Sequence, residues 1–554
     1  LLNDYLAKIA AGSPVKMFPL HNKPETERNA QGLKLSDLSL IYSFEYTADV
    51  KLEKVINYLL SLGCFEYVQP WYLPKISLTP NDTSVGLQNH LGIINAFNAW
   101  GVNNGDPSIV VGITDTGTEY THSDLGNIAF NTADGPVVNG LDDDLDGYID
   151  NYQGWDVSMN DRDATFQVLA HGVHVTGLSS ATTNNSNGVA GVGWNCKYLP
   201  VKVSNASGVL NSAYQGITYA ADHGCDIINC SWGSAGAGGP MEQAVVDYAT
   251  INKGCLVVAA AGNGGNNIPV FPSALNYVLA VANTTDSDVK DGSSTYGYDV
   301  DVCAPGTCYS TYGGNGYTTS SGTSMASPVT AGAAAIVKSF FPTYTGLQVG
   351  ERLKVTCDNI YSLNPGYVNM LGNGRINLYR ALTDPAVPSV VNTLRNVTDN
   401  NDEAFVFGDT LSIFGDHTNY LAVTTTSCTA TLSSTSPYVM VLDGTTALGV
   451  INTLQTVNNN TDHFRVEILT GAPVNTVVTF QLTYTAGTYT QSYWFDVTIN
   501  VDYINISIND VGTTITSRGR LGYNTDAQTQ GLGFVYLGTN SLLYEMSSMT
   551  GTSA

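Results

Sequence analysis

The stretch GTSMASP, residues 322–328, begins the most apolar segment of this 554-residue chain. Residues 325–337 are almost all small or apolar, which is typical of a helix buried inside a large domain. We predict a helix from this stretch to about Phe341, with Pro328 in its opening turn, where a missing N–H is tolerated. Ser324 then lies where free N–H groups and the helix dipole favour a developing negative charge. That position suits a nucleophile, although a serine there can also simply cap the helix.

A serine nucleophile needs a histidine to accept its proton and a carboxylate to orient that histidine. His171 begins the sequence HGVHVTG, and Asp115 follows the apolar run VVGIT and precedes a tight turn. The three residues occur in the order Asp115, His171, Ser324. The alternative of a nucleophile elbow requires glycine two residues after the serine, and Ala326 occupies that position.

At these motifs the chain resembles the subtilisin-like serine proteases, the subtilases, over roughly residues 90–382. The motifs that carry the resemblance are TDTG (114–117), HGVHV (171–175), GTSMASP (322–328) and VVAAAGN (257–263). Their order is the Asp, His, Ser order of subtilisin. The resemblance implies an Asp115/His171/Ser324 triad that works through an acyl-enzyme, with Asn263 and the Ser324 N–H in the oxyanion hole.

The histidine motif departs from the family pattern at Ala170, where glycine is usual, and at Val173, where threonine is usual. Neither departure removes a catalytic group. His174 is expected to be a structural residue on the helix that His171 begins.

Substrate binding in subtilases pairs an extended peptide with exposed backbone edges, which is a form of strand addition. The resemblance implies these substrate-binding residues: Ser207, Gly208, Ser231, Trp232, Gly233 and Gly264. For Trp232 the alternative is a core aromatic residue, because the sequence does not show where its side chain points.

Short apolar runs alternate with helical stretches over this region, which is typical of βαβ units. We predict an α/β peptidase domain over residues 81–384, with a subtilisin-like, mostly parallel sheet and helices on both faces. The runs predicted as strands are 109–114, 198–203, 226–230, 255–260 and 277–282, and those predicted as helices are 213–223 and 241–253. Asp115 and Asn263 follow strand ends, where open α/β sheets place their ligand sites.

Residues 1–80 have the pattern of a small α+β unit. Residues 40–46 are strand-like, and Asp49 can cap an amphipathic helix that Gly63 ends. Residues 65–76 contain two prolines and are predicted to be an extended or edge segment.

The resemblance implies that this N-terminal unit is a prodomain, which assists folding and then inhibits the enzyme as an intramolecular partner. We expect self-cleavage between about Pro74 and Asn81.

After residue 384 the composition shifts to Thr, Ser, Asn, Val and Tyr. Residues 479–485 and 492–501 have the pattern of half-buried strands. We predict a β-sandwich over residues 385–502 and a smaller β-rich segment over residues 503–554. Contact with a cell surface or with carbohydrate is a candidate role for these β-domains.

A second candidate site is the acidic sequence DDDLDGYID, residues 142–150. It places carboxylates at positions 1, 3, 5 and 9 of a calcium loop and glycine at position 6. The expected ligands are Asp142, Asp144, Asp146, Asp150 and the backbone carbonyl of Tyr148. Position 12 is Gln153, not the bidentate glutamate of an EF-hand, and a solvated acidic loop is the alternative. We expect a structural Ca²⁺ ion, which subtilases commonly bind, and no organic cofactor.

The formal net charge of −25 argues against binding to nucleic acid or to an anionic membrane, both of which require basic patches. No apolar run approaches the length of a membrane span. The nine cysteines form no CxxC pair. Cys225, Cys230 and Cys255 are expected to be buried thiols, whereas Cys303 and Cys308 could close a small disulfide loop in an oxidising compartment.

The sequence is compatible with two functions. The first is a calcium-stabilised serine endopeptidase that acts on polypeptides, is made as a zymogen and is exported, we expect from a bacterium, to the medium or the cell surface. The second is a catalytically silent or weak subtilase scaffold whose β-domains mediate adhesion. A scaffold tolerates loss of Asp115, His171 or Ser324, and none of them is lost.

Overall fold

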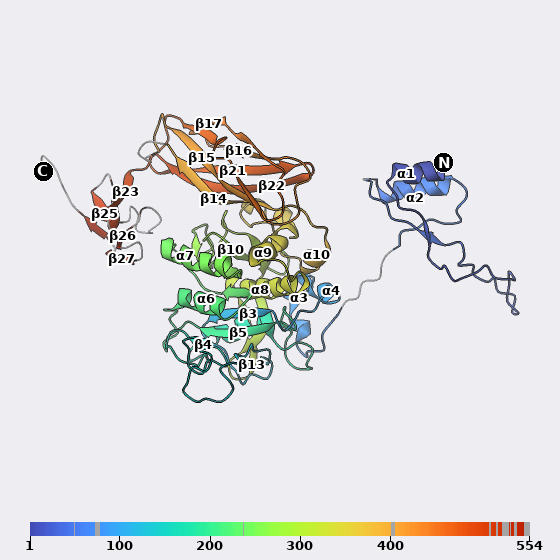
Figure 1. Ribbon diagram of the computed structural model, residues 1–554, viewed down its shortest axis with the longest axis horizontal. Helices are drawn as coiled ribbons and strands as arrows, with labels where there is room; N and C mark the ends of the chain where they lie inside the picture. The colour runs from blue at the N-terminus through green and yellow to red at the C-terminus, as the bar shows by residue number, and fades with distance from the viewer. Residues whose placement is uncertain are drawn as a thin grey trace. The chain divides into compact units, whose positions relative to one another are not determined.

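The computed structural model describes residues 1–48, 50–71, 78–235, 238–399, 405–508, 511–516, 519–522, 531, 533–536, 540–543 and 545–547. The chain separates into two compact units, Leu1–Lys75 and Ile76–Ala554 (Figure 1). Asp49 and residues 72–77 lie outside the described residues, and they include the first half of the expected self-cleavage segment 74–81.

The N-terminal unit contains helices α1 (Leu2–Lys8) and α2 (Leu52–Ser61) and a two-stranded antiparallel pair, β1 (Val15–Lys16) with β2 (Tyr42–Ser43). The helices pack through one small core: Leu6, Ile9, Val55 and Leu59. Of the strand predicted over residues 40–46, only residues 42–43 form a strand, β2. Residues 65–71 of the segment predicted to be extended or an edge form neither helix nor strand, and residues 72–77 lie outside the described residues.

A seven-stranded sheet is the centre of the peptidase domain, and every strand pair in it is parallel. In spatial order its strands are β11 (Val302–Pro305), β10 (Val278–Thr284), β8 (Leu256–Ala260), β6 (Ile227–Cys230), β3 (Val110–Asp115), β5 (Lys197–Lys202) and β4 (Trp155–Asp156). The five predicted strands are all present, each within two residues of its expected ends. The prediction of a parallel α/β sheet is confirmed.

Successive side chains of these strands enter two different hydrophobic cores, because strand side chains alternate between the two faces of a sheet. Ile227 and Val258 pack into the core that contains the inner face of helix α8, whereas Ile228 and Val257 pack into a second core. The helices of the first core are α3 (Asn89–Ile93), α4 (Ala96–Trp100), α5 (His171–Ser180), α8 (Thr323–Phe340), α9 (Gly346–Val355) and α10 (Leu378–Thr383). The second core is covered by α6 (Ala213–Asp222) and α7 (Pro240–Asp247), which continues as a π-helical turn, Tyr248–Asn252. Helices thus cover both faces, as predicted.

Smaller elements complete the domain. Strand β7 (Ser234–Ala235) pairs with β9 (Val270–Phe271), and β12 (Thr307–Tyr312) forms a hairpin with β13 (Gly316–Ser321) immediately before α8. Short 3₁₀ turns occupy Val85–Leu87, Tyr361–Leu363 and Pro365–Tyr367.

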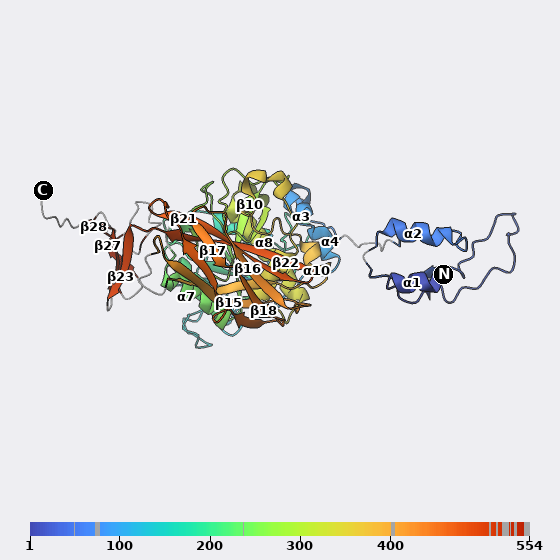
Figure 2. The same cartoon turned by 90° about the horizontal axis from the view of Figure 1, so that it is seen from above.

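Two antiparallel sheets follow the peptidase domain and enclose one hydrophobic core, which is the architecture of a β-sandwich (Figure 2). The first contains β14 (Val390–Thr398), β15 (Thr410–Asn419), β20 (Phe464–Ile468), β17 (Val439–Asp443) and β19 (Gln455–Asn458). The second contains β18 (Thr445–Gly449), β16 (Cys428–Ser433), β21 (Thr476–Ala486) and β22 (Tyr489–Ile499). A separate antiparallel sheet beyond residue 502 contains β23 (Tyr503–Ile508), β24 (Val511–Thr516), β25 (Arg520–Gly522), β26 (Phe534–Tyr536), β27 (Asn540–Leu543) and β28 (Glu545–Ser547).

All nine cysteines have free thiols. Cys225, Cys230 and Cys255 are buried, as expected. The disulfide considered between Cys303 and Cys308 is absent, and each of these thiols instead donates to a backbone carbonyl, of Leu371 and Pro305 respectively. In the described part of the chain, no helix is both long enough and apolar enough to cross a bilayer.

Two histidines are buried in the first core, His90 on α3 and His174 on α5. Among the described residues, neither ring nitrogen of His90 has a hydrogen-bond partner, and Nε2 of His174 bonds to the carbonyl of Thr318 at 3.2 Å. Burial disfavours the imidazolium form and lowers the pKa of His90 to about 3 and that of His174 to about 4. His174 is therefore a structural residue, as the sequence predicted.

We expect acid to destabilise the fold through these two side chains. Because their folded-state pKa values are lowered, the unfolded chain binds their protons first, so their contribution to stability is lost as the pH falls below about 6.5. At pH 5 each histidine should lower the free energy of unfolding by about 2 kcal/mol. The measurement is urea unfolding at pH 7 and pH 5 of the full chain and of His90→Leu, which should lose part of this pH dependence; an unchanged pH dependence in the variant would contradict the argument.

Candidate active site

Four neighbouring parallel strands, β8, β6, β3 and β5, bring their carboxyl ends to one edge of the sheet. Asp115 is the last residue of β3, and the segments that follow the other three strands contain Asn263, residues 231–233 and residues 203–209. The residues that the sequence assigned to catalysis and substrate binding are therefore gathered at one edge, with α5 and α8 packed against each other beneath it.

Asp115 is the last residue of β3 and only 2% exposed, and His171 is the first residue of α5. The Nδ1 atom of His171 lies 2.8 Å from Oδ1 of Asp115, which also accepts a hydrogen bond from the N–H of Thr116 at 2.7 Å. Gly172 permits this close approach, because a Cβ at this position would lie 2.3 Å from the carbonyl oxygen of Gly117. The strand end and the helix start thus fix the histidine against the carboxylate.

The pKa of His171 is the balance of two opposed effects. Burial lowers it, whereas the negative charge of Asp115 and the hydrogen bond to it raise it, and the net pKa lies above the ordinary value of 6.5. The His171 side chain is still 34% exposed, so its other ring nitrogen can reach a substrate. A histidine with these properties can accept a proton and hold it as a stabilised imidazolium.

Ser324 is the second residue of α8, and no hydrogen bond occupies its backbone N–H in the described chain. Its hydroxyl donates to the carbonyl of Ser231 at 3.1 Å and makes no hydrogen bond with His171 among the described residues. A rotation about the Cα–Cβ bond is therefore needed before His171 can accept the hydroxyl proton.

The position predicted for Pro328 is wrong. The helix begins at Thr323, so Pro328 lies in the second turn and its missing N–H leaves the carbonyl of Ser324 without a helical partner. The hydroxyl of Ser231 donates to that carbonyl at 2.9 Å and satisfies it. The proline is tolerated because a side chain from the loop after β6 replaces the lost hydrogen bond.

The side chain of Asn263 is held by the first residue of α8. Its Oδ1 atom accepts from the N–H of Thr323 at 2.9 Å and from the Thr323 hydroxyl at 3.0 Å. With the oxygen occupied, the amide NH₂ of Asn263 is the group left without a hydrogen-bond partner in the described chain, as is the N–H of Ser324. Two donors on adjoining segments can stabilise one negatively charged oxygen.

The expected substrate-binding residues lie in three segments of this edge, which follow β5, β6 and β8. Ser207 and Gly208 belong to a tight turn after β5 in which Gly208 has a φ of +82°, and the side chain of Leu169, two residues before His171, lies 3.2 Å from where a Cβ of Gly208 would be. Ser231, Trp232 and Gly233 follow β6, and Gly264 follows Asn263.

The side chain of Trp232 does not face the substrate edge. Its indole N–H donates to the carbonyl and hydroxyl of Thr114 at 3.0 and 3.1 Å, and its ring packs edge-on against Tyr214. The alternative of a packed aromatic residue holds for the side chain, so only the backbone of Trp232 remains available to a peptide.

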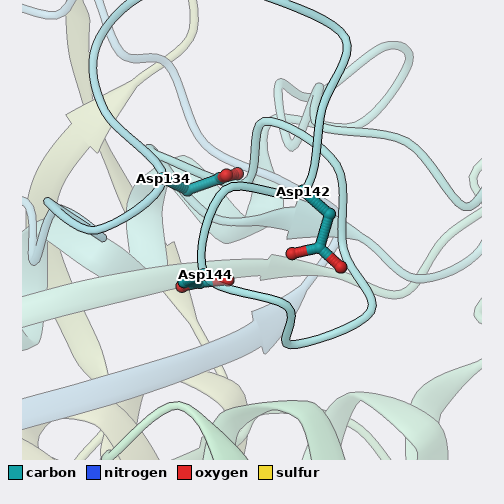
Figure 3. A group of neighbouring side chains, drawn as sticks. All are labelled: Asp134, Asp142 and Asp144. Carbon is teal, nitrogen blue, oxygen red and sulfur yellow. The ribbon is translucent and has the colours of Figure 1, made fainter.

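The acidic loop of residues 142–150 is arranged differently from the predicted ligand set. Asp142 and Asp144 form a cluster with Asp134, a residue that the sequence reading missed, and a carboxylate oxygen of each lies within 4.8 Å of the others (Figure 3). Asp146 instead contacts Nε2 of His223 at 2.9 Å, and Asp150 accepts from the backbone N–H groups of residues 139 and 140. Asp134 precedes the loop by eight residues, so the spacing of an EF-hand could not reveal it.

The chain is similar to known proteins. Residues 106–374 match the subtilase family. The chain is 37% identical over 339 residues to a thermophilic serine proteinase of Bacillus sp. (strain AK1), covering 60% of this chain and 76% of that protein. It is 37% identical over 309 residues to thermitase of Thermoactinomyces vulgaris, covering 55% of this chain and 99% of that protein. A solved protease from Pseudoalteromonas arctica PAMC 21717 matches with a TM-score of 0.46 and 29% identity, covering 55% of this chain and 98% of that one.

The Bacillus relative, of which the chain covers 76%, is named as a serine proteinase. The chain belongs to the subtilase family, and it is a serine endopeptidase.

Proposed function

We propose that Asp115, His171 and Ser324 are the catalytic triad and that Asn263 and the Ser324 N–H form the oxyanion hole. The observation that carries this proposal is the 2.8 Å contact between His171 and the buried Asp115, at the sheet edge where the first turn of α8 contains Ser324. In the proposed mechanism, Ser324 turns from the carbonyl of Ser231 towards His171 and attacks the scissile carbonyl. His171 accepts the hydroxyl proton and later gives it to the leaving amine.

Asp115 keeps the Nδ1–H tautomer of His171 and stabilises the imidazolium. The tetrahedral oxyanion is stabilised by the amide of Asn263 and by the helix N-terminus. Collapse of this intermediate leaves an acyl-enzyme on Ser324, which water hydrolyses with the same proton transfers in reverse order. Backbone groups of Ser207–Gly208, Ser231–Gly233 and Gly264 are proposed to pair with the extended substrate.

A serine-directed fluorophosphonate probe tests this assignment. We expect the full chain to be labelled and its Ser324→Ala variant to remain unlabelled. Ser327→Ala is the matched control, because Ser327 is a buried serine on the same helix whose hydroxyl bonds to Asn229 at 2.8 Å. Labelling that persists in Ser324→Ala would contradict the assignment, and an inert full chain would favour the scaffold alternative.

We also propose that residues 1–80 are an autoprocessed prodomain. Support comes from the compact unit Leu1–Lys75, which has its own core and precedes a peptidase domain. The same gel that follows labelling should show release of an N-terminal fragment from the full chain and none from Ser324→Ala. We further propose that a bacterium exports this zymogen to the medium or the cell surface. The β-domains are proposed to attach the enzyme there.

The acidic cluster Asp134, Asp142 and Asp144 is proposed to hold a structural Ca²⁺ ion. The three residues fit, because oxygens within 4.8 Å of one another can all reach one ion at 2.3–2.6 Å, and three carboxylates in one place repel each other without a cation. The ion would stabilise the loop and take no part in peptide hydrolysis.

Chelation should therefore lower the thermal unfolding temperature of the Ser324→Ala protein. Calcium at a hundredfold its Kd should add about 2.7 kcal/mol of stability. Asp144→Asn should abolish this calcium response, and Asp143→Asn is the matched control in the same loop, since Asp143 is outside the cluster. A calcium response that survives in Asp144→Asn would place the ion elsewhere.

A further inference from the structure

A cavity of about 210 Å³ lies between the peptidase domain and the β-sandwich, inside the unit Ile76–Ala554. Its walls come from the segment before β10, the loop 298–301, helix α9 and strands β14 and β22. The triad residues Asp115, His171 and Ser324 do not line it. Concave sites between domains are a preferred location for small ligands.

The back of the cavity is built from groups that already have partners. Lys354 is buried and forms ion pairs with Glu351 at 2.9 Å and Asp301 at 3.0 Å, so its charge is neutralised. Glu351 also accepts from the hydroxyl of Ser389 at 2.6 Å, and this bond joins α9 to the segment that leads into the sandwich. These contacts hold the two domains together around the cavity.

Two opposite charges at the cavity have no ion-pair partner. Asp299 comes from the peptidase domain and Arg395 from β14 of the sandwich, and the guanidinium of Arg395 lies over the ring of Phe495, 3.9 Å from its centroid. In the described chain neither side chain forms a hydrogen bond or an ion pair, so the N–H edge of the guanidinium is not engaged. The charge of each group shifts the pKa of the other, although no nitrogen of Arg395 lies within 4.0 Å of a carboxylate oxygen of Asp299. Burial of the carboxylate and the negative charges of Asp301 and Asp496 raise the pKa of Asp299 to about 6, so a cation beside it would be favourable.

The wall of the cavity also carries aromatic rings from both domains. Tyr298 of the peptidase domain and Trp494 of β22 are stacked, with ring centroids 6.4 Å apart and an interplanar angle of 20°. Tyr420 is 92% buried, and its hydroxyl has no hydrogen-bond partner in the described chain. In the described chain, the cavity thus combines a carboxylate and a guanidinium that have no ion-pair partner, aromatic rings and a hydroxyl group without a hydrogen-bond partner.

We propose that this cavity binds a free α-amino acid as a zwitterion. The planar guanidinium of Arg395 suits the α-carboxylate, with which it can form two parallel hydrogen bonds. Asp299 suits the α-ammonium, and the faces of Trp494 and Tyr298 add a cation–π attraction. A volume of about 210 Å³ is below the range of about 300–1,000 Å³ typical of drug-sized ligands, which fits a single amino acid.

The proposal is tested by calorimetric titration of the full-length Ser324→Ala chain, in which autolysis cannot supply amino acids. Glycine, L-phenylalanine and L-glutamine share the zwitterionic group and differ in side chain, and at least one is expected to bind at millimolar concentration or below. For L-phenylalanine the matched probes are 2-phenylethylamine, which lacks the carboxylate, and 3-phenylpropionate, which lacks the ammonium. Each should bind about 10- to 100-fold more weakly, because each loses one charged hydrogen-bonding partner.

Arg395→Gln and Asp299→Asn should each weaken binding of the amino acid that binds by a similar factor, while the exposed Arg465→Gln on β20 should leave it unchanged. Unchanged unfolding temperatures without added amino acid would show that the variants fold. Absence of binding by all three amino acids, equal binding of both truncated probes, or preference for the neutral sugar maltose would overturn the proposal. Because Ser324→Ala is used throughout, failure here is distinct from failure of the proposed triad.

Discussion

Replacing Asp115 by asparagine should lower kcat about 10⁴-fold while leaving the fold intact. The size of the effect is the one established for the same carboxylate in serine proteases, including subtilisin. Its physical reason here is the 2.8 Å contact with His171: an amide at position 115 favours the wrong tautomer and provides no charge to stabilise the imidazolium. The loss should appear in kcat more than in KM, since the buried side chain of Asp115 cannot touch a substrate.

Asp115→Asn should also change the pH dependence of kcat/KM. In the native enzyme Asp115 raises the pKa of His171 against the opposing effect of burial, so the rise of kcat/KM with pH should have an apparent pKa above 6.5. With the carboxylate removed only burial remains, and the residual activity should rise with an apparent pKa below 6.5. Asp163→Asn, an exposed carboxylate whose partners are only in its own loop, is the control and should leave the profile unchanged. A full-rate Asp115→Asn enzyme would show that His171 is oriented by something else.

The sequence predicted the parts of the site that are encoded locally. Asp115 follows an apolar strand and Ser324 precedes a buried helix, so their surroundings could be inferred from neighbouring residues alone. The parallel sheet and the β-sandwich followed from hydrophobic periodicity for the same reason.

Residues that act through the tertiary structure were missed. Asp134 reaches the acidic cluster only because the chain folds back, and Thr323 gives no sign in the sequence that its hydroxyl holds Asn263. The correction at Pro328 has a similar origin, because the hydroxyl that compensates for the proline comes from Ser231, 93 residues away in sequence from Ser324. The residues next to His90 in the sequence also do not distinguish this buried histidine from one on the surface.

Replacing Asn263 by aspartate should lower kcat about 100- to 1,000-fold, the scale measured for the corresponding donor in subtilisin. Aspartate keeps the oxygen that accepts from the N–H and hydroxyl of Thr323, so the side chain should stay in place. What changes is the outward-facing group, from an N–H donor to a carboxylate oxygen that repels the oxyanion. The expected signature is a large fall in kcat with little change in KM or unfolding temperature.

Thr323→Val separates the orientation of the amide from its presence. This variant retains the Asn263 donor and the backbone N–H of residue 323 but removes the hydroxyl, which donates to Oδ1 and accepts from the N–H of Gly262. Loss of the hydrogen bond to Asn263, about 0.5–1.5 kcal/mol, predicts a fall in kcat of about 2- to 12-fold, well short of the effect of Asn263→Asp. If the two variants lost equal activity, Asn263 would act by supporting the start of α8 and not as a donor to the oxyanion. If neither lost activity, the Ser324 N–H and the helix dipole would be sufficient, and the role proposed for Asn263 would be wrong.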